Sequence, residues 1–496
     1  MKNNKYNIPG MSKGLHGLER ESMRTTFDGK ISMSPHPGSL GSSLTHRYIQ
    51  TDFSESQLEF ITNPVRGIED SLEKLDHIQA YTNSMLQDEL LWPMSMPPEI
   101  PEDDNEIPLA YYGKSKCGKE KAIYRRGLGL RYGRKMQSIS GIHYNFSLPH
   151  EVLLESLMKR GEKADSSSIS QIYFNMIRNY LRRITHIIYL FGASPVVDSS
   201  FISDSRVELV KFKKSTLYSK YATSLRMSEI GYTCNEQKKI NISFDSLNNY
   251  LSDICYAIEN CNPNYEKYSN NPDNQLNPNY LQNENEYYAP IRPKRFTGLN
   301  ERLIDNLSKE GVQYLEIRSI DIDPACRIGI DKFTIGFVNV VLIDSLINES
   351  PPLDDNEKDY IFENISRVIW NGRKKGLKVF DKGNEKDFRD EGKRYCDRLI
   401  EISEFMDKEN KTDLYTKSLE KQLKKWDSSG LTPSGRQLVN ILDGNKEFVQ
   451  YGLEIAQRNR LSYESMELHS DFIDEMESER VRSITMQEEI EKGECS

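Results

Sequence analysis

Four short segments of the chain alternate polar and apolar residues, which is the pattern of a β-strand that is buried on one face. They are GLERE (17–21), QLEFI (57–61), GIHYNFSL (141–148) and YLEIR (314–318). In each segment the ionisable or polar side chains share one face, and largely apolar side chains take the other. The alternation predicts strands of an antiparallel sheet that has one polar face.

Longer stretches repeat apolar residues at the spacing of a helix. Residues 67–90 form the first stretch, and 168–191 predict a single long, partly buried helix. From about residue 330 the pattern is helical over 331–348, 386–407, 411–425 and 434–460. The tail 464–494 carries charges of both signs, which predicts a solvated helix.

These elements suggest how the chain is organised. We expect a catalytic core at 1–330 that carries the sheet, and a mainly helical part at 331–496 that packs on it within one large domain. The segment 262–288 is rich in Asn and poor in aliphatic residues, so it predicts a mobile surface excursion.

Composition narrows the class of protein. The net charge of −9 and the pI of about 5.6 argue against a general nucleic-acid binder, which needs a basic surface. No apolar run approaches the ~18 residues of a membrane span, and the first residues lack the apolar centre of a signal peptide. The seven cysteines include no CxxC pair, which predicts reduced thiols. We expect a cytoplasmic protein with neither membrane nor nucleic-acid partners.

One glycine-containing segment has the general form of a phosphate-binding loop. Residues 113–119 match G-x-x-x-x-G-K, and the next residue of such a loop is a Ser or Thr that holds Mg²⁺. Glu120 stands at that position and would repel phosphate. A P-loop kinase is therefore a distant alternative.

If the four predicted strands belong to one sheet, its polar face gathers a set of ionisable side chains. The set is Glu19, Glu21, Glu59, His143, Glu316 and Arg318. Clustered carboxylates repel one another unless cations neutralise them, and carboxylates with one imidazole suit Mg²⁺ or Mn²⁺. An ordinary sheet with one wetted face would show the same spacing, so both interpretations stay open.

Arginine and tyrosine are interleaved in three further segments. These are 124–132, which begins Tyr124-Arg125-Arg126, 221–232, which contains Arg226, and 287–295, which contains Tyr288. Arginine offers bidentate donors to carboxylate or phosphate, and tyrosine adds a hydroxyl and an apolar wall. The segments predict sites for anionic substrates, although solvated surface loops would have the same composition.

Several segments, in order along the chain, are similar to motifs of one enzyme family. They are GLERESMR (17–24), HPGSLGSSLTH (36–46), TDFSESQLEFIT (51–62), WPMSMP (92–97), MQSISGIHYNFSLP (136–149), YLFGASP (189–195), YATSLRMSEIGYT (221–233), ENEYYAPIRPKR (284–295) and YLEIRSIDIDP (314–324). Together they resemble glutamate–cysteine ligase of the proteobacterial type, from about residue 10 to 330. Beyond 330 the resemblance is weaker, and WNGRKKGL (370–377) has Lys375 where the family has proline.

The resemblance implies an α+β fold like that of glutamine synthetase, with a curved antiparallel sheet that forms a funnel-shaped active site and helices packed around it. It implies Mg²⁺ ligands, with Mn²⁺ as a substitute, at Glu19, Glu21, Asp52, Glu59, His143 and Glu316. It implies a substrate pocket at Phe53, Tyr124, Arg125, Gln137, Asn145, Arg226, Tyr232 and Tyr288. Nucleotide contacts are implied at Arg318, Arg373 and Lys374, and Arg318 and Glu316 are the implied catalytic residues.

The implied activity is ligation of the γ-carboxylate of L-glutamate to the amine of L-cysteine. ATP drives it through γ-glutamyl phosphate, and the reaction is the first step of glutathione biosynthesis. Glutathione is the expected feedback inhibitor, and a monomer is the expected state. Two alternatives stay open: the same chemistry with another amine, ammonia included, and a non-catalytic relative that senses nucleotide or γ-glutamyl peptide.

Overall fold

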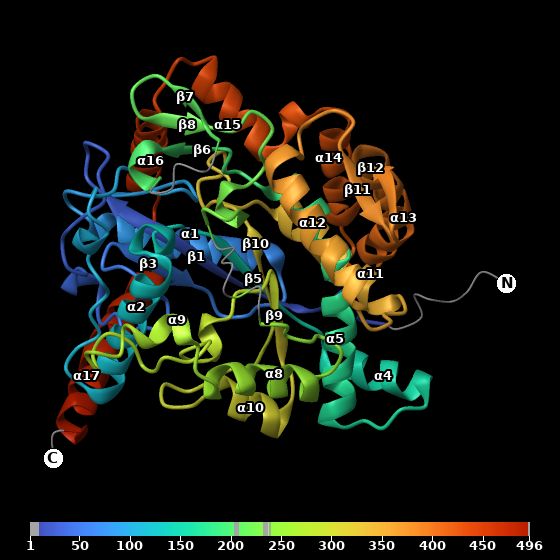
Figure 1. Cartoon of the computed structure of the whole chain (residues 1–496), viewed down its shortest axis with the longest axis horizontal. Helices are drawn as coiled ribbons and strands as arrows, with labels where there is room; N and C mark the ends of the chain where they lie inside the picture. Colours follow the sequence, from blue (N-terminus) through green and yellow to red (C-terminus); the bar gives the residue numbers. More distant parts are fainter. Residues whose placement is uncertain (1–8, 203–207, 232–236, 238–239, 495–496) are drawn as a thin grey trace.

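The sheet predicted by the alternating segments is present in the computed structural model of the protein, which describes residues 9–202, 208–231, 237 and 240–494. Its strands follow the order β2-β3-β1-β5-β10-β9, neighbouring strands are antiparallel, and β4 pairs with the end of β1. Figure 1 labels β1, β3, β5, β9 and β10 of this sheet. The strands of this sheet are β1 (Leu15–Thr25), β2 (Ile49–Thr51), β3 (Gln57–Ile61), β4 (Leu90–Leu91), β5 (Ile142–Ser147), β9 (Ile291–Lys294) and β10 (Tyr314–Ile320). Smaller sheets are formed by β6 (Val196–Asp198), β8 (Thr216–Tyr218) and β7 (Val210–Phe212), and by β11 (Lys378–Asp381) with β12 (Asn384–Asp387).

The four strands predicted from alternation are confirmed as β1, β3, β5 and β10. On β3, Leu58 and Phe60 are fully buried in the hydrophobic core, and the period-two geometry turns Glu59 between them to the opposite face. Strands and helices occur together, so the α+β class is confirmed. The curvature of the sheet stays a prediction.

The helices vary in length from one turn to more than six turns. They are α1 (Ile68–Met85), α2 (Lys116–Tyr132), α3 (Arg134–Gln137), α4 (His150–Arg160), α5 (Ser166–Leu181), α6 (Ile184–Phe191), α8 (Leu247–Glu259), α9 (Pro263–Glu266), α10 (Leu303–Glu310), α11 (Lys332–Ile347), α12 (Asp355–Asn371), α13 (Phe388–Asn410), α14 (Leu414–Asp427), α15 (Pro433–Leu442), α16 (Phe448–Glu464) and α17 (Ser470–Glu494). None of the helices in the described ranges is long and apolar enough to span a bilayer.

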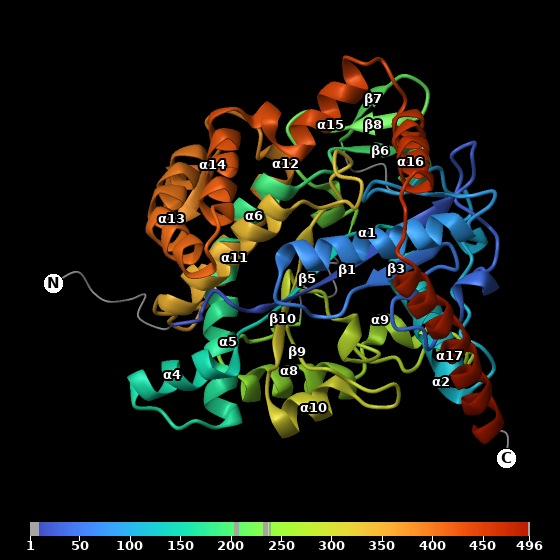
Figure 2. The same cartoon turned by 180° about the vertical axis from the view of Figure 1, so that it is seen from behind.

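Helices cover the apolar face of the main sheet. Helix α1 packs on β1 and β3, while α5 and α6 pack on β9 and β10. Figure 2 shows α1 lying across this side of the molecule. Their apolar side chains join those of the strands and of α11 in one core. The opposite face of the sheet, which carries the ionisable side chains, is left for the site.

The prediction of a single helix over 168–191 is wrong, because the chain turns at Arg182 and Arg183 and forms two helices, α5 and α6. Arg182 makes an ion pair of 2.7 Å with Glu357 of α12 and donates to the carbonyl of Pro351. Contacts with distant residues accompany this break, and no Gly or Pro marks it locally.

The helix predicted over 434–460 is also two helices, α15 and α16. Here the sequence does hold a signal, since Gly444 and Asn445 lie between them and Asn445 has a φ of 53°. Asn tolerates this left-handed conformation better than most residues do. Helices α2, α4, α8, α10 and α12 and the β11–β12 hairpin were not predicted.

The charged tail forms α17 but is more than the solvated helix that was predicted. Met476, Glu479 and Ser483 on one of its sides are buried. Glu479 pairs with Arg47 at 2.7 Å, ahead of β2, and Figures 1 and 2 both show α17 running beside α2. The end of the described chain therefore packs on its N-terminal part.

The Asn-rich segment 262–288 is held against α2 by specific contacts, which a freely mobile excursion would lack. Arg131 of α2 donates to Gln275 and to the carbonyl of Asn277, and it pairs at 2.9 Å with Glu286. The side chains of Arg131 and Glu286 are fully buried.

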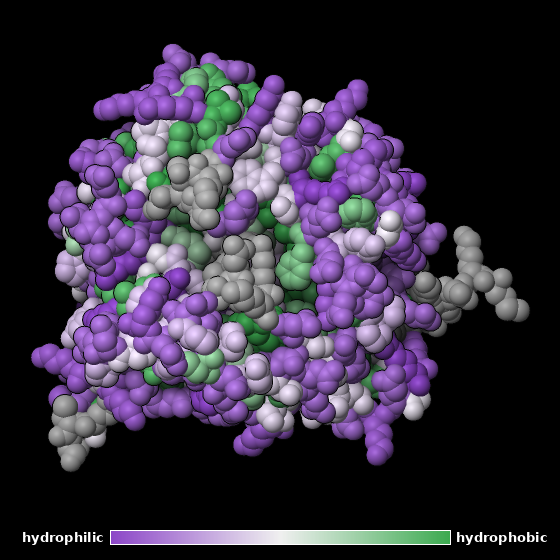
Figure 3. Space-filling view, in the orientation of Figure 1, coloured by the Kyte–Doolittle hydropathy of each residue, from purple (hydrophilic) through white to green (hydrophobic). Residues whose placement is uncertain are grey.

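The face of the molecule seen in Figure 3 is mostly hydrophilic, with hydrophobic side chains gathered in a hollow near its centre.

Candidate active site

Strand pairing brings the predicted acidic residues together on the polar face of the sheet. Glu19 on β1 stands opposite His143 on β5, and Glu21 stands opposite Glu59 on β3. On the other side of β5, Glu316 of β10 stands opposite Asn145. The register of the strands therefore brings these residues together from four strands, which the sequence spacing alone could not show.

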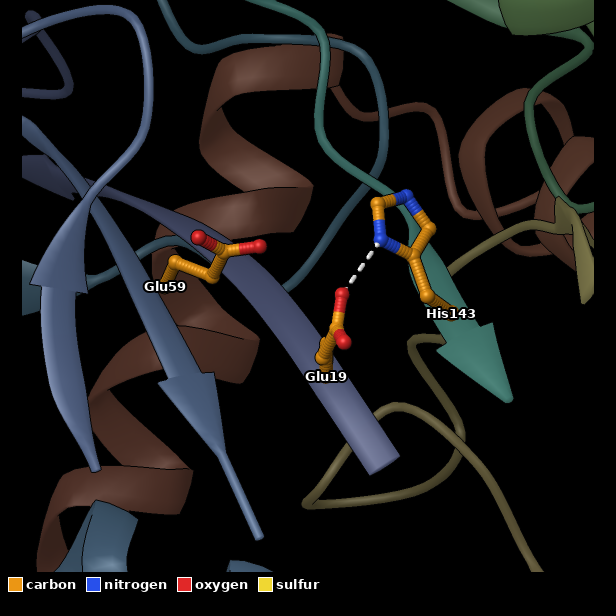
Figure 4. A group of neighbouring side chains, drawn as sticks. All are labelled: Glu19, Glu59 and His143. Carbon is orange, nitrogen blue, oxygen red and sulfur yellow. Dashed lines mark hydrogen bonds and ion pairs between the residues drawn. The ribbon is translucent and has the colours of Figure 1, made fainter. Parts of the chain in front are cut away.

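Glu19, Glu59 and His143 point toward one another (Figure 4). One possible ligand atom from each of them lies within 4.8 Å of the other two. His143 Nδ1 is 3.0 Å from Glu19 Oε2, and Asn145 donates to Glu19 Oε1 at 2.7 Å. Glu19 is thus oriented from two sides by its neighbours on β5.

Burial and mutual repulsion disfavour ionisation in part of this group. The pKa of Glu59 lies well above its usual value because the carboxyl is buried and faces Glu19, Asp52 and Glu21. Burial also raises the pKa of Glu21. Burial opposes ionisation of Glu19 as well, but the hydrogen bond with His143 and the charges of His143 and Lys294 together lower its pKa. A bound cation would relieve the repulsion among these carboxylates.

Asp52 reaches the same region from the turn between β2 and β3. Its carbonyl accepts hydrogen bonds from the Tyr112 hydroxyl, at 2.8 Å, and from the Arg125 guanidinium. The Arg125 guanidinium also lies over the Tyr112 ring, 4.5 Å from its centre. The backbone of Asp52 is therefore fixed, and its side chain joins the acidic group without a partner strand.

Glu316 differs from the other carboxylates because cations surround it. Its oxygens lie 3.5 Å from Lys294, 3.3 Å from Arg318 and 3.9 Å from Arg292. Burial opposes its ionisation, but Lys294, Arg318 and His143 hold the pKa far below its usual value. Glu316 is a fixed negative charge between the acidic group and a basic edge of the sheet.

All these groups face one cavity of about 810 Å³. The predicted residues that line it are Glu19, Glu21, Asp52, Phe53, Glu59, Tyr124, Arg125, Gln137, His143, Tyr288, Glu316 and Arg318. The six predicted metal ligands therefore line one cavity together with aromatic and basic residues.

Helix α2 carries Tyr124 and Arg125 into the cavity wall. Its first turn is capped by the Ser115 hydroxyl, which accepts from the backbone amide of Gly118 at 3.1 Å. The start of α2 is the segment that matched the P-loop form, and no strand leads directly into it: β4, which precedes it, ends at Leu91. The capping and the missing strand rule out the P-loop interpretation.

Four predicted site residues in the described ranges do not line the cavity. Asn145 is turned to Glu19, as stated above, and Lys374 is exposed. Arg226 is fully buried, 3.4 Å from Asp321, and donates to the carbonyl of Arg318 at 2.8 Å. Arg373 donates to the carbonyls of Ala222 and Lys220. Tyr232 lies outside the described residues.

Lys294 and Arg292 are cavity residues that were not predicted as site residues. Both lie on β9 and share a face, because Ile291 and Pro293 alternate with them. The same alternation that identified β10 could have found them. The segment 287–295 was predicted as a site for anionic substrates, but Tyr288 was its only predicted site residue. Lys121 of α2 also lines the cavity, and burial lowers its pKa to about 8.

The donor set fits a divalent cation that prefers oxygen. Carboxylate oxygens with one imidazole are typical ligands of Mg²⁺ and Mn²⁺. Burial and the charges of its acidic neighbours raise the pKa of Glu59, and a bound cation would oppose both effects. The acidic face and the cationic edge beside it form a site that is suited to hold a divalent cation next to a phosphate or carboxylate group.

Comparisons with known proteins identify the family. A sequence profile of the glutamate–cysteine ligase family matches residues 2–368. The glutamate–cysteine ligase of Leptospira interrogans is 44% identical over 483 residues, covering 97% of this chain and 93% of the relative. That of Pseudomonas fluorescens is 37% identical over 494 residues, covering 98% and 92%.

Structure comparison agrees. A crystal structure of glutamate–cysteine ligase from Francisella tularensis in complex with AMP matches with a TM-score of 0.90 and 32% identity, over 96% of this chain and 94% of that one. The chain belongs to the glutamate–cysteine ligase family. The similarity extends well past residue 330, where the motifs recognisable in the sequence became weaker.

Proposed function

We propose that the protein is an ATP-dependent ligase that joins the γ-carboxylate of L-glutamate to the amine of L-cysteine, the first step of glutathione biosynthesis. The observation that carries this proposal is the single cavity in which five carboxylates and His143 face a basic edge. Membership of the family and the AMP complex of the Francisella enzyme support it.

The reaction has to activate a carboxylate that is a poor acyl donor. An oxygen of the glutamate γ-carboxylate attacks the γ-phosphorus of ATP, the bond to the bridging oxygen breaks, and ADP leaves. The cysteine amine then attacks the γ-carbonyl of the acyl phosphate, inorganic phosphate leaves, and the amine loses a proton. Both steps bring anions together, so they need fixed positive charge.

Glu19, Glu21, Asp52, Glu59, His143 and Glu316 are the proposed ligands of Mg²⁺. When bound there, Mg²⁺ would supply the charge that lets ATP phosphates approach these carboxylates. His143 is oriented by its contact with Glu19, which suits a ligand better than a base that must be free to accept a proton.

Arg318 is the proposed catalytic cation on the protein side. Its guanidinium lies 3.3 Å from Glu316 and 5.7 Å from the centre of the Tyr288 ring, so it is aimed along the border between the acidic group and the aromatic wall. In this place it can stabilise charge on the transferred phosphoryl group. Mn²⁺ can substitute for Mg²⁺ in the same donor set.

Phe53, Tyr124, Arg125, Gln137 and Tyr288 are the proposed cysteine-side wall. An apolar pocket separates substrates that differ by a methyl group by only ~1–3 kcal/mol. We therefore expect leaky use of small amines such as 2-aminobutyrate. The guanidinium of Arg226, which was also predicted for this pocket, is instead bound to Asp321 and to the Arg318 carbonyl.

Further proposals concern the chain as a whole. Arg373 and Lys374 are proposed to contact the nucleotide. The Arg373 guanidinium also donates a hydrogen bond to the backbone carbonyl of Ala222. Feedback inhibition by glutathione, a monomeric state and a cytoplasmic location are proposed on the family resemblance alone. The contacts of α17 with the N-terminal part support one catalytic unit rather than two separable domains.

The direct test is ADP release in the presence of ATP and Mg²⁺. We expect little release with glutamate alone, rapid release when cysteine is added, and slower release with 2-aminobutyrate. Faster release with ammonia or another amine would identify a different ligase of the same chemistry. No release under any combination would favour a non-catalytic sensor.

A further inference from the structure

The polar face of the main sheet changes sign from one side to the other. Glu59, Glu21 and Glu19 lie on β3 and β1, toward one edge. At the opposite edge, β9 carries Arg292 and Lys294, both turned to the same face as Glu316 of the neighbouring strand. Glu316 stands on the border between the acidic and the basic parts.

The two cations of β9 are held in different ways. Arg292 is 4% exposed, and it donates to the carbonyls of Glu284 at 2.9 Å and Asn285 at 3.1 Å. Its guanidinium is thereby fixed to the backbone. The Lys294 side chain is 19% exposed, lines the cavity, and its ion pair with Glu316 is 3.5 Å long. A well-formed charged hydrogen bond is ~2.7–2.9 Å long, so this pair is loose.

Lys294 and Arg318 stand on either side of one carboxylate. Lys294 is nearest to Oε1 of Glu316 and Arg318 is nearest to Oε2. A cation that binds Glu316 would replace both of them as the neutralising charge. Lysine is a compact charge on a flexible stem, so it can then move to another anion inside the cavity.

We propose that Lys294 is a phosphate-binding residue that exchanges partners during the reaction. In the free protein it pairs with Glu316, and when a divalent cation takes Glu316 it turns to the phosphates of the bound nucleotide, opposite Arg318. This inference rests on the proposed function for the identity of the nucleotide. The first part of the proposal is the competition between Lys294 and a cation for Glu316, and it can be tested without any substrate.

The test compares Lys294→Met with wild type in two binding measurements. Mn²⁺ binding to the nucleotide-free protein, measured from the electron paramagnetic resonance of free Mn²⁺, should tighten at least ~threefold because a competing charge is lost. ADP binding at saturating Mg²⁺, measured by calorimetry, should weaken about tenfold because a phosphate contact is lost. Lys294→Arg should recover part of the ADP affinity. A merely structural lysine would not move the two affinities in opposite directions.

Lys309→Met is the matched control, because Lys309 is an exposed lysine of α10 outside the cavity lining. It should change neither affinity. Unchanged Mn²⁺ affinity or unchanged ADP affinity in Lys294→Met would overturn the proposal. If Lys294→Met does not fold, as judged by circular dichroism, Lys294→Gln takes its place with the same criteria. Because neither measurement contains glutamate or cysteine, a wrong amine assignment would leave this result intact.

Discussion

Glu21 of β1 and Glu59 of β3 stand directly opposite each other in the antiparallel sheet. Like charges in this position are destabilising, and burial makes the repulsion more severe. The pKa of Glu59 is accordingly raised well above its usual value, first by burial and then by Glu19, Asp52 and Glu21. The sheet holds a carboxylate pair that is unfavourable without a cation, which is the physical basis of the proposed metal site.

Glu59→Gln should raise the thermal stability of the metal-free protein and lower its turnover. In EDTA the variant should melt at a higher temperature than wild type, because an amide removes one buried, repelled carboxyl group. Added Mg²⁺ should stabilise wild type strongly and the variant weakly. Turnover should fall at least ~10²-fold.

Thermal denaturation with and without Mg²⁺ checks this prediction. Glu404→Gln is the control, since Glu404 is exposed on α13 and lies outside the cavity lining. A lower melting temperature for Glu59→Gln than for wild type in EDTA would show that the pair of carboxyls is not under repulsion.

Arg318→Lys should lower kcat by about 10²–10³-fold with a smaller effect on the KM for glutamate. Arginine presents a planar fork of donors, and lysine offers only a point charge in its place. Because Glu316 and the acidic group stay intact, Mn²⁺ affinity in the absence of nucleotide should change little. Steady-state kinetics and Mn²⁺ titration measure the two effects, and a rise in KM with kcat unchanged would argue against a role in phosphoryl transfer.

Acid sensitivity should follow from three buried histidines and the half-buried His36. Burial lowers the pKa of His16 and His46 to about 4, and that of His36 and His186 to about 3. In the unfolded chain each has a pKa of about 6.5, so below that pH the unfolded state binds protons that the folded state does not. Stability should therefore fall as the pH drops from about 6.5 toward 4, by up to ~1.4 kcal/mol per pH unit for each histidine.

Urea unfolding between pH 7.5 and 5 measures this loss. His46 is the informative position, because its Nδ1 accepts from the backbone amides of Tyr48 at 3.1 Å and Ile49 at 2.9 Å and must stay unprotonated. His46→Gln should make the pH dependence shallower, while His469→Gln, at an exposed site, should not. An equal slope in both variants would mean that other groups cause the acid sensitivity.

Glu479→Gln should loosen α17 from the rest of the protein. The Glu479 side chain is fully buried, accepts from the Arg47 amide at 2.8 Å, and pairs with Arg482 at 2.5 Å. Burial opposes ionisation of Glu479, but Arg482 and Arg47 lower its pKa to about 2. The stabilisation is thus present above the unfolded value of about 4.5 and is lost as the pH falls toward 2.

Hydrogen exchange at pH 7 measures this effect. Faster exchange is expected in residues 41–48 and in α17 of Glu479→Gln, with the main sheet unchanged. Glu488→Gln is the control, because the side chain of Glu488 is 61% exposed. Uniform acceleration across the whole chain would point to global destabilisation instead.

The acidic half of the site could be predicted because strand alternation places Glu19, Glu21, Glu59 and Glu316 on one face whatever the rest of the fold does. Register could not be predicted, so the opposition of Glu21 to Glu59 appears only in the structure. Asp52 came from the family motif alone, since it sits in a turn where no periodicity operates.

The basic half was harder to predict for a different reason. Arg292 and Lys294 alternate with Ile291 and Pro293, but the proline obscured a strand at the edge of the sheet. Helix α2 has no clear apolar stripe, because its helical surface meets a cavity and polar partners rather than a core. Arg226, predicted in the pocket, is instead buried beside Asp321, a contact that only tertiary structure determines.

The measurement that tests the central claim most directly is anomalous scattering from a crystal of the protein grown with Mn²⁺ and ADP. We expect Mn²⁺ within coordinating distance of Glu19, Glu59 and His143, and Lys294 turned from Glu316 to a phosphate. Mn²⁺ bound elsewhere, with these carboxylates contacting only solvent or protein, would contradict it.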